Sequence, residues 1–198
     1  RDQPLMPIVS IPAPDALQRL AEFDAVIDAR SESEYAEDRL PGAINWPTLN
    51  DAERALVGTE YKQVSPFTAR KRGAVLAARN IAAHIEREGM DKPKDWTPLV
   101  YCWRGGQRSG ALATVLSAIG FRVHLLEGGY REFRRAVIAA LEELPQRFDF
   151  RVVCGTTGSG KSRLLQRLAE TGAAQVLDLE PLANHRGSVL GLVPGSPQ

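Results

Sequence analysis

The sequence predicts an α/β fold in which a parallel sheet is flanked by helices and followed by the start of a second α/β unit. Short apolar segments typical of buried strands alternate with longer segments whose apolar residues have helical spacing. Two strand-like segments lead into distinctive loops, one holding a cysteine and the other rich in glycine. A helical segment follows each loop. Because a helix N-terminus attracts anions, these loops are the candidate sites.

The first unit is expected to span residues 1–146. Residues 6–11 and 25–30 are apolar and of strand length, and residues 14–23 between them have the spacing of an amphipathic helix. Ser31 follows the second strand and is suited to cap a short helix.

A turn and two helical segments come next. Residues 41–47 contain a Pro-Gly turn and then a brief strand. Residues 51–62 are polar and helical at their start. Residues 67–88 predict a long helix, because Ala, Val, Leu and Ile recur at spacings of three and four.

The last part of this unit repeats the strand–helix alternation. Residues 97–101 predict a buried strand, and residues 110–119 predict a helix packed on the sheet. A strand at 123–126 is followed by a glycine turn and a helix at 130–144. Pro145 ends that helix, because proline does not fit a helix interior.

The second unit is expected to span residues 147–198 and to begin an α/β domain of the phosphate-loop type. A strand at 150–154, a helix at 163–170 and a strand at 175–179 are expected. Two strands and one helix cannot bury the core of such a domain. The chain is therefore expected to be a piece of a longer protein, or one whose second domain was lost.

Composition narrows the function classes. The net charge of +1 gives no global field that would attract nucleic acid or membrane, although a local basic patch can still bind RNA. Two cysteines make a disulfide framework unexpected and suit a reducing cytoplasm. The three histidines do not cluster with the cysteines at metal-ligand spacing. No apolar run reaches the roughly 18 residues of a membrane span, and no signal-peptide pattern is seen.

The cysteine loop predicts a stabilised thiolate. It reads Cys102-Trp103-Arg104-Gly105-Gly106-Gln107-Arg108-Ser109. Backbone N–H groups, the helix dipole and the charges of Arg104 and Arg108 all favour the anion, and such settings place a thiol pKa well below about 8.5. Gly105 and Gly106 let the backbone curl so that its N–H groups face inward. The plainer interpretation of Cys102 is a small buried hydrophobe.

The glycine-rich loop predicts a phosphate-binding site. Residues 155–162 match G-x-x-x-x-G-K-[ST] between a strand and a helix, as the motif requires. The backbone N–H groups of the loop would hold phosphate oxygens. Gly155, Gly158 and Gly160 have no side chains, so a phosphate can approach these N–H groups closely. Lys161 would reach the terminal phosphates, and the Ser162 hydroxyl is a possible Mg²⁺ ligand. The alternative is a glycine-rich turn with a solvent-facing lysine.

Three residues near this loop have open roles. Asp178 and Glu180 follow the expected strand and are candidates for contact with a metal or substrate, or for capping and solvated positions. Cys154 is expected to pack within its strand. No metal site and no tightly bound cofactor are predicted.

Several segments together resemble a rhodanese domain. They are the strand Val26-Ile27-Asp28-Ala29-Arg30, the pair Glu34-Tyr35, the run Pro41-Gly42-Ala43-Ile44-Asn45 and the Cys102 loop. A phosphate loop directly after such a domain makes the chain similar to bacterial tRNA 2-selenouridine synthases. The similarity continues in Asp178-Leu179-Glu180 and in Ala183-Asn184-His185-Arg186-Gly187-Ser188.

This resemblance implies a two-part reaction on tRNA. The family replaces sulfur by selenium in wobble 2-thiouridine, with selenophosphate as donor. It also transfers a geranyl group from geranyl diphosphate to that sulfur, making the group that selenium displaces. Cys102 corresponds to the cysteine of the selenium step, where Arg104, Arg108 and the loop amides would hold the phosphate of selenophosphate. The glycine-rich loop would hold the diphosphate. An enzyme that makes selenophosphate is an implied partner.

The residues that would contact tRNA are the hardest to identify from the sequence. Candidate phosphate contacts are Arg70, Lys71 and Arg72 in one run and Arg131, Arg134 and Arg135 in another. Such runs are more often solvated helix faces. Trp46, Trp103 and Tyr61 are candidates to stack on a base or to pack in the core, and Trp103 is favoured because it adjoins Cys102.

Three other functions stay open. Cys102 and Arg108 are separated by five residues, the spacing of cysteine-dependent phosphatases, although Tyr101 stands where those enzymes have histidine. A plain thiosulfate sulfurtransferase is the second alternative. The third is a non-catalytic module that binds RNA or nucleotide.

Overall fold

The computed structural model describes residues 7–183. It divides the chain into two compact units, Arg1–Pro145 and Gln146–Gln198. Among the described residues, no helix combines the length and the apolar character needed to cross a membrane.

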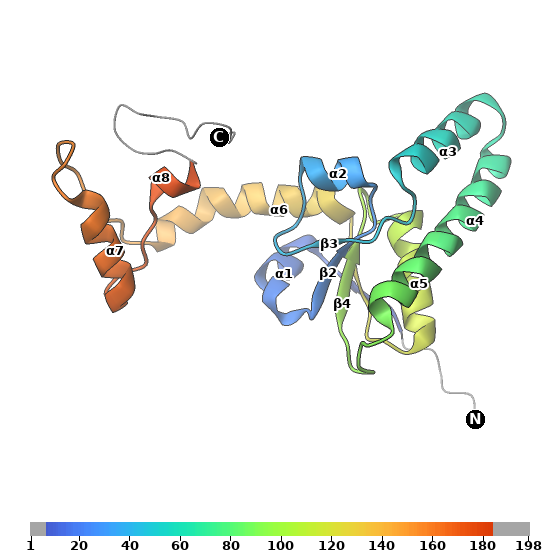
Figure 1. Cartoon of the computed structure of the whole chain (residues 1–198), viewed down its shortest axis with the longest axis horizontal. Helices are drawn as coiled ribbons and strands as arrows, with labels where there is room; N and C mark the ends of the chain where they lie inside the picture. Colours follow the sequence, from blue (N-terminus) through green and yellow to red (C-terminus); the bar gives the residue numbers. More distant parts are fainter. Residues whose placement is uncertain (1–6, 184–198) are drawn as a thin grey trace. The chain divides into compact units, whose positions relative to one another are not determined.

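The first unit is built on a five-stranded sheet of order β1-β5-β4-β2-β3, in which every pair is parallel. The predicted parallel α/β fold is therefore confirmed. Its strands are β1 (Val9–Ile11), β2 (Ala25–Asp28), β3 (Ile44–Asn45), β4 (Pro98–Tyr101) and β5 (His124–Leu126) (Figure 1).

The parallel register brings the carboxyl ends of β2, β4 and β5 to one edge of the sheet. Asp28 at the end of β2 pairs with Tyr101 at the end of β4, and Val100 pairs with Leu125 of β5. The loops that follow these three strands therefore meet at a common edge, as in other parallel α/β sheets. Cys102 lies in the central one of these loops.

Helices cover both faces of the sheet (Figure 1). Alternate strand residues enter two separate apolar clusters, as the two-residue period of a strand requires. One cluster includes residues of α1 (Ala13–Gln18) and α6 (Gly129–Glu143). The other includes residues of α4 (Pro66–His84) and α5 (Gln107–Ile119), and Cys102 belongs to it.

The remaining elements of this unit are short, except for α3. They are η1 (Leu20–Glu22), α2 (Glu32–Glu37), α3 (Asp51–Gln63), η2 (Ile85–Gly89) and η3 (Leu144–Arg147), the last two residues of which belong to the second unit. Ser31 forms a capping box with Glu34 at the start of α2, so the capping role expected for it is confirmed. A second capping box, between Asn50 and Glu53, starts α3.

Helix α5 begins three residues earlier than the spacing of apolar residues predicts. Periodicity detects only side chains that face the core, whereas Gln107 and Arg108 in the first turn are polar. Gly106 occupies the N-cap, so the first turn lies directly against the cysteine loop.

The second unit contains α7 (Lys161–Thr171) and α8 (Leu179–Leu182) in its described part. The predicted strands at 150–154 and 175–179 are wrong, since these residues are irregular apart from the start of α8. A strand needs a neighbour for its backbone hydrogen bonds, and the described residues of this unit offer none. The expected motif at 184–188 and the Gly/Pro-rich stretch at 187–197 lie outside the described residues.

A buried ion pair lies at the carboxyl edge of the sheet. The Arg30 guanidinium donates to both carboxylate oxygens of Asp28 at 2.7–3.0 Å, and the two side chains are 1% and 0% exposed. The Tyr101 hydroxyl also donates to Asp28 at 2.8 Å and accepts from the Leu40 backbone N–H. Burial and the Asp28 charge raise the pKa of Tyr101, so its hydroxyl stays a donor.

Replacing Asp28 should destabilise the first unit strongly. Asp28→Ala leaves the Arg30 charge buried without its partner, a change that typically costs about 3–5 kcal/mol of unfolding free energy. Urea unfolding followed by tryptophan fluorescence measures the loss. Glu22→Gln, which breaks the exposed Arg19–Glu22 pair, is the matched control and should leave the midpoint almost unchanged. Equal midpoints for Asp28→Ala and the control would show that the buried pair is not a stabilising contact.

Candidate functional site

Cys102 is held between the end of β4 and the first turn of α5. The residue is only 3% exposed, and three hydrogen-bond donors surround its sulfur. The Ser109 hydroxyl donates to Sγ at 3.1 Å and the Gly106 backbone N–H at 3.3 Å. The Ser109 backbone N–H is the third donor. The cysteine is thus both a core residue and a hydrogen-bonded one.

The surroundings of Cys102 favour its ionised form. Burial by itself raises the pKa of the thiol. The donors from Ser109 and Gly106, with the positive charge of Arg108, outweigh that effect, so the pKa of Cys102 lies below that of an ordinary thiol. The direction agrees with the sequence-based expectation. The main contribution nevertheless comes from hydrogen bonds, with arginine charge a smaller one.

The cysteine loop is shaped by close backbone contact with the start of α6. Gly105 has a φ of +67°, which suits glycine. A Cβ on Gly129, whose φ is +61°, would lie 2.1 Å from the Cys102 carbonyl oxygen. The Tyr130 N–H donates to that same oxygen at 2.8 Å. Only glycine at position 129 lets the two loops approach this closely.

Arg108 forms an ion pair with a carboxylate, a partner that the sequence did not predict. It donates to both oxygens of Glu34 at 2.6 and 3.3 Å. Burial raises the pKa of Glu34, but the Arg108 hydrogen bond and charge, with help from Ser31 and Arg54, lower it overall. Arg108 is therefore oriented by an ion pair across the loop and does not point freely into it.

Ser109 is a residue of the candidate site for which the sequence predicted no role. It stands at the end of the cysteine run, and its hydroxyl reaches the sulfur because α5 has already begun at Gln107. A helix start placed at residue 107 would have revealed this contact, since residues in a first helical turn face the preceding loop.

Arg104 and Trp103 lie on the outside of the loop. Arg104 is exposed and, among the described residues, makes no ion pair. Trp103 is 38% exposed and stacks on Tyr130 with ring centres 5.5 Å apart. The Arg30 guanidinium lies 4.3 Å from the Tyr130 ring centre and 6.0 Å from that of Trp103. Trp103 is thus a partly open aromatic surface next to Cys102 in the chain, with a rigid support.

In the second unit, the Lys161 side chain folds back onto the glycine-rich loop. Lys161 donates from Nζ to the carbonyl oxygens of Gly155 and Thr156 at 2.9 and 2.8 Å. Gly158 and Gly160 have φ values of +82° and +84°, and Gly160 is the N-cap of α7. The Ser162 hydroxyl is in an exposed residue at the start of the helix. The loop therefore presents a cation and a helix N-terminus together.

The neighbouring residues of open role are also placed. Asp178 caps α8 by accepting from the Glu180 N–H at 3.1 Å, which favours capping over metal contact. Cys154 is exposed, so the prediction that it packs within a strand is wrong. Within the described residues, no group of three or more His, Cys, Asp and Glu side chains is arranged to hold a metal ion.

The predicted tRNA-contact residues divide into paired and unpaired cations. Arg131 and Arg135 pair with Glu132, and Arg134 pairs with Asp38. In the other run, Arg72 pairs with Glu60, Arg70 donates to the Pro66 carbonyl and Lys71 lies 4.9 Å from the Phe67 ring centre. Of the aromatic candidates, Trp46 is fully buried and packs in the core, whereas Tyr61 is 55% exposed.

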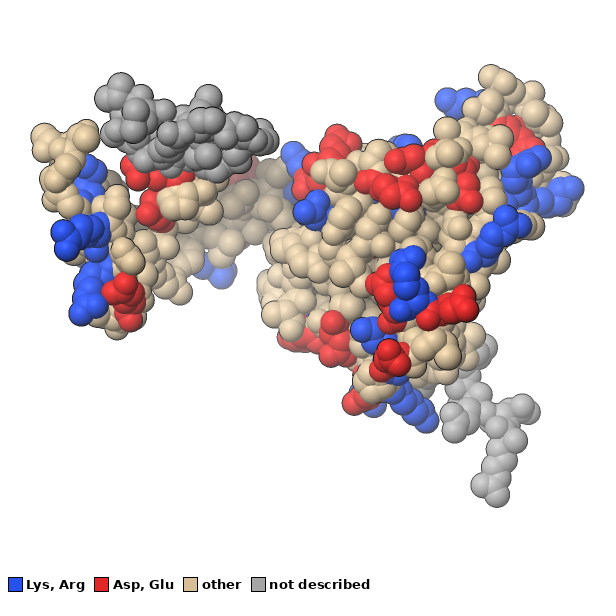
Figure 2. All heavy atoms as spheres, viewed as in Figure 1, with Lys and Arg blue, Asp and Glu red and all other residues tan. Residues whose placement is uncertain are grey.

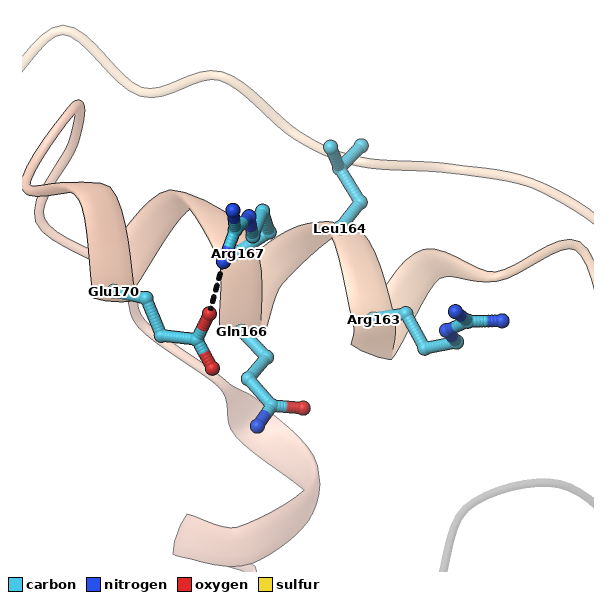
Figure 3. A pocket seen from close by; sticks show the side chains of 5 residues that line it. All are labelled: Arg163, Leu164, Gln166, Arg167 and Glu170. Carbon is cyan, nitrogen blue, oxygen red and sulfur yellow. Dashed lines mark hydrogen bonds and ion pairs between the residues drawn. The ribbon is translucent and has the colours of Figure 1, made fainter.

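A hollow on α7 does not belong to either candidate loop. Figure 3 shows its lining, which comes from one helix: Arg163, Leu164, Gln166, Arg167 and Glu170. Arg167 donates to Glu170 at 3.0 Å within it. No second described element closes the hollow, so we assign it no ligand.

Removing the Ser109 hydroxyl should make the thiol less acidic. In Ser109→Ala the thiolate loses its side-chain donor, so the pKa of Cys102 rises. Alkylation of Cys102 by iodoacetamide at neutral pH, followed by peptide mass spectrometry so that the exposed Cys154 is measured separately, should slow by about tenfold, the order of magnitude of one hydrogen bond to a charged group. The rates of the variant and the parent should converge at high pH, where both thiols are ionised.

The control for this measurement is Thr114→Ala on the same helix. The Thr114 hydroxyl is exposed and donates to the Gly110 carbonyl, far along the chain from the sulfur. Its alkylation profile should match the parent's. An unchanged profile in Ser109→Ala would show that the hydroxyl does not stabilise the thiolate.

Comparison with known proteins supports both parts of this description. Residues 13–136, more than half of the chain, match the family model of the rhodanese-like domain. Residues 148–198 match the model of the tRNA 2-selenouridine synthase AAA domain. A crystal structure of an N-terminal domain from Clostridium difficile 630 has a TM-score of 0.53 and 31% identity, covering 67% of this chain and 99% of that one.

Curated relatives cover most of this chain. The tRNA 2-selenouridine synthase of Nitrosomonas europaea is 37% identical over 84% of this chain and 43% of its own length. That of Proteus mirabilis is 39% identical over 87% of this chain and 46% of its own. The chain thus spans somewhat less than half the length of these relatives, and its resemblance to them is confirmed. The chain belongs to the family of rhodanese-like domains and continues into a segment of the tRNA 2-selenouridine synthase AAA type.

Proposed function

We propose that the complete protein carrying this chain is a tRNA 2-selenouridine synthase. It replaces sulfur by selenium in wobble 2-thiouridine of tRNA, with selenophosphate as the selenium donor. The relatives of that name support the proposal, because they match the chain across both units. The observation that carries it is the buried Cys102 sulfur that accepts hydrogen bonds from Ser109 and Gly106 in the rhodanese-like unit, followed in the same chain by a lysine-bearing glycine-rich loop.

The reaction proceeds through a geranylated intermediate. The sulfur of 2-thiouridine attacks geranyl diphosphate, so that a carbon–sulfur bond forms and diphosphate leaves. Selenium from selenophosphate then forms a bond to C2 of the base, and the geranylated sulfur leaves with the electrons of the broken bond. Water releases the phosphate from selenium. These substrates place the reaction in the cytoplasm, where an enzyme that makes selenophosphate supplies the donor.

The selenium step is assigned to the cysteine loop. Cys102, as thiolate, faces the reacting selenium, and the Gly105 and Gly106 amides hold the phosphate. Arg104 is the available guanidinium for that phosphate, because Arg108 is already bound to Glu34. Trp103 offers its open face to the target base.

The geranyl step is assigned to the second loop. Lys161, with the Gly155, Gly158 and Gly160 backbone, holds the diphosphate, which presents the same oxygens as the end of a nucleotide. The exposed Ser162 hydroxyl suits Mg²⁺ as a single ligand. A bound Mg²⁺ would neutralise negative charge on the leaving diphosphate.

The spacing of Cys102 and Arg108 favours a second candidate, a phosphatase. A guanidinium at that spacing would have to hold a substrate phosphate, whereas Arg108 gives two hydrogen bonds to Glu34. Turnover of an aryl phosphate tests this function. Cyanide-dependent formation of thiocyanate tests a plain sulfurtransferase.

Loss of the Cys102 sulfur should abolish selenation. The complete protein is incubated with 2-thiouridine tRNA, geranyl diphosphate and selenophosphate, and the nucleosides are analysed by mass spectrometry. A 2-selenouridine peak is expected, and it should fall below detection in Cys102→Ser because a hydroxyl does not ionise at neutral pH. Cys154→Ser, the exposed second cysteine, is the control and should retain the peak. Full selenation by Cys102→Ser would remove the cysteine from the mechanism.

Loss of the Lys161 ammonium should weaken diphosphate binding. Lys161→Ala removes the cation that the loop carbonyls hold in place, and Kd for geranyl diphosphate should rise about tenfold or more, as for other charge-assisted contacts. Isothermal titration calorimetry measures it. Arg167→Ala, on the same helix but paired with Glu170, should bind as the parent does. Equal Kd values for all three proteins would place the diphosphate elsewhere.

A further inference from the structure

Helices α3 and α4 form a hairpin whose outer part contributes little to the core. No residue of α3 is buried, and the buried residues of α4 are Ala69, Ile81 and His84. In Figure 1 the two helices run side by side and project from the sheet. We call residues 59–72 the hairpin tip: they comprise the end of α3, the connecting turn and the start of α4.

The base of the hairpin is fixed to the first unit. Asn80 of α4 donates to the Thr48 carbonyl at 3.1 Å and to the Glu53 carboxylate at 2.6 Å. The His84 ring contacts the Pro47 carbonyl at 3.1 Å, and it stacks on Trp46. The hairpin tip is therefore carried on a rigid base.

Large apolar side chains are exposed on the hairpin tip. Tyr61 is 55%, Val64 72% and Phe67 63% exposed. Single exposed apolar residues are ordinary on a protein surface. Here three of them lie within the seven-residue segment 61–67, which joins α3 to α4, and we treat them as one patch. Patches of this kind commonly mark a binding surface. Two of the three side chains are aromatic and have flat faces.

The same tip is strongly basic. It contains Lys62, Arg70, Lys71 and Arg72 against one carboxylate, Glu60, although the whole chain has a net charge of only +1. Figure 2 shows Lys and Arg atoms gathered over this part of the hairpin. Glu60 pairs with Arg72 at 2.8 Å and so joins α3 to α4. Among the described residues, the other three cations are in no ion pair with a carboxylate.

We infer that the hairpin tip is a docking surface for unpaired RNA. Bases would stack on Tyr61 and on the face of Phe67 that Lys71 does not cover, while Lys62, Arg70 and Lys71 pair with the phosphates between them. Arg72 is assigned a different role, because its pairing with Glu60 stiffens the tip. That the RNA is tRNA rests on the proposed function; the chemistry of the surface rests on the hairpin alone.

The aromatic half of the inference is tested by Tyr61→Leu/Phe67→Leu. Leucine keeps the apolar character and removes the flat π face, so a membrane or protein partner would tolerate it whereas stacked bases would not. Fluorescence anisotropy of labelled 2-thiouridine tRNA with the complete protein should show Kd raised about tenfold to a hundredfold. The dependence of log Kd on log salt should keep its slope, since no charge is lost.

The charged half is tested by Lys62→Gln/Arg70→Gln/Lys71→Gln. Each cation that neutralises a phosphate of a single strand contributes about 0.7 to the slope of log K against log salt, so the slope should flatten by about 2. Lys92→Gln/Lys94→Gln/Arg122→Gln removes the same charge near the opposite edge of the sheet, before β4 and β5. This control should keep the parent's slope.

The outcomes separate this inference from the proposed function. If the protein makes 2-selenouridine and both hairpin variants bind tRNA with the parent's Kd and slope, the docking surface is overturned and the function stands. If tRNA binding depends on the hairpin tip but no 2-selenouridine is formed, the docking surface is supported and the proposed function is contradicted. Binding to vesicles containing phosphatidylserine that survives the leucine changes, with tRNA binding unaffected, would assign the tip to a membrane and overturn the inference.

Kinetics gives a further check. Since the hairpin tip is separate from Cys102 in the fold, its variants should raise KM for tRNA and leave kcat unchanged. A fall in kcat with constant KM would contradict a docking role. Circular dichroism of each variant verifies the fold, which exposed substitutions should not disturb.

Discussion

One buried charge pair holds together the edge of the sheet at which the cysteine lies. Arg30 and Asp28 are almost completely inaccessible. The cost of removing two charges from water is offset because the Asp28 carboxylate accepts from the Arg30 guanidinium and from the Arg30 backbone N–H. Asp28 also accepts from Tyr101, the residue before the cysteine, and Arg30 donates to the Asp38 carbonyl. The pair therefore ties two strands and a surface loop to a single arrangement.

The cysteine depends on that arrangement through its backbone more than through its side chain. The Cys102 carbonyl accepts from the Tyr130 N–H, and the Tyr130 ring lies between Arg30 and Trp103. The sulfur itself accepts hydrogen bonds from the start of α5, on the face of the sheet opposite to α6. Two helices on opposite faces of the sheet thus hold one residue. A buried thiol becomes acidic here because its local hydrogen bonds outweigh the desolvation that burial brings.

The fold could be predicted from the sequence where apolar spacing is informative. The four main strands and the long helices of the first unit have that pattern, and the motif around Cys102 locates its loop. Apolar spacing does not locate the first turn of a helix when that turn is polar. The start of α5 and the hydrogen bond from Ser109 to Cys102 were therefore not predicted. The pattern also contains no information about which strands pair. Residues 150–154 were therefore predicted as a strand, although the described residues offer no neighbouring strand. Charge partners such as Glu34 for Arg108 lie 74 positions apart, and only folding brings them together.

The tryptophans have a spectroscopic consequence. Trp46 and Trp96 are 0% and 3% exposed and lie in one apolar cluster, whereas Trp103 is 38% exposed on the cysteine loop. The two buried indoles supply a constant emission background. Light emitted by the third responds to whatever approaches the cysteine loop, which gives the protein an intrinsic optical probe in the residue next to Cys102.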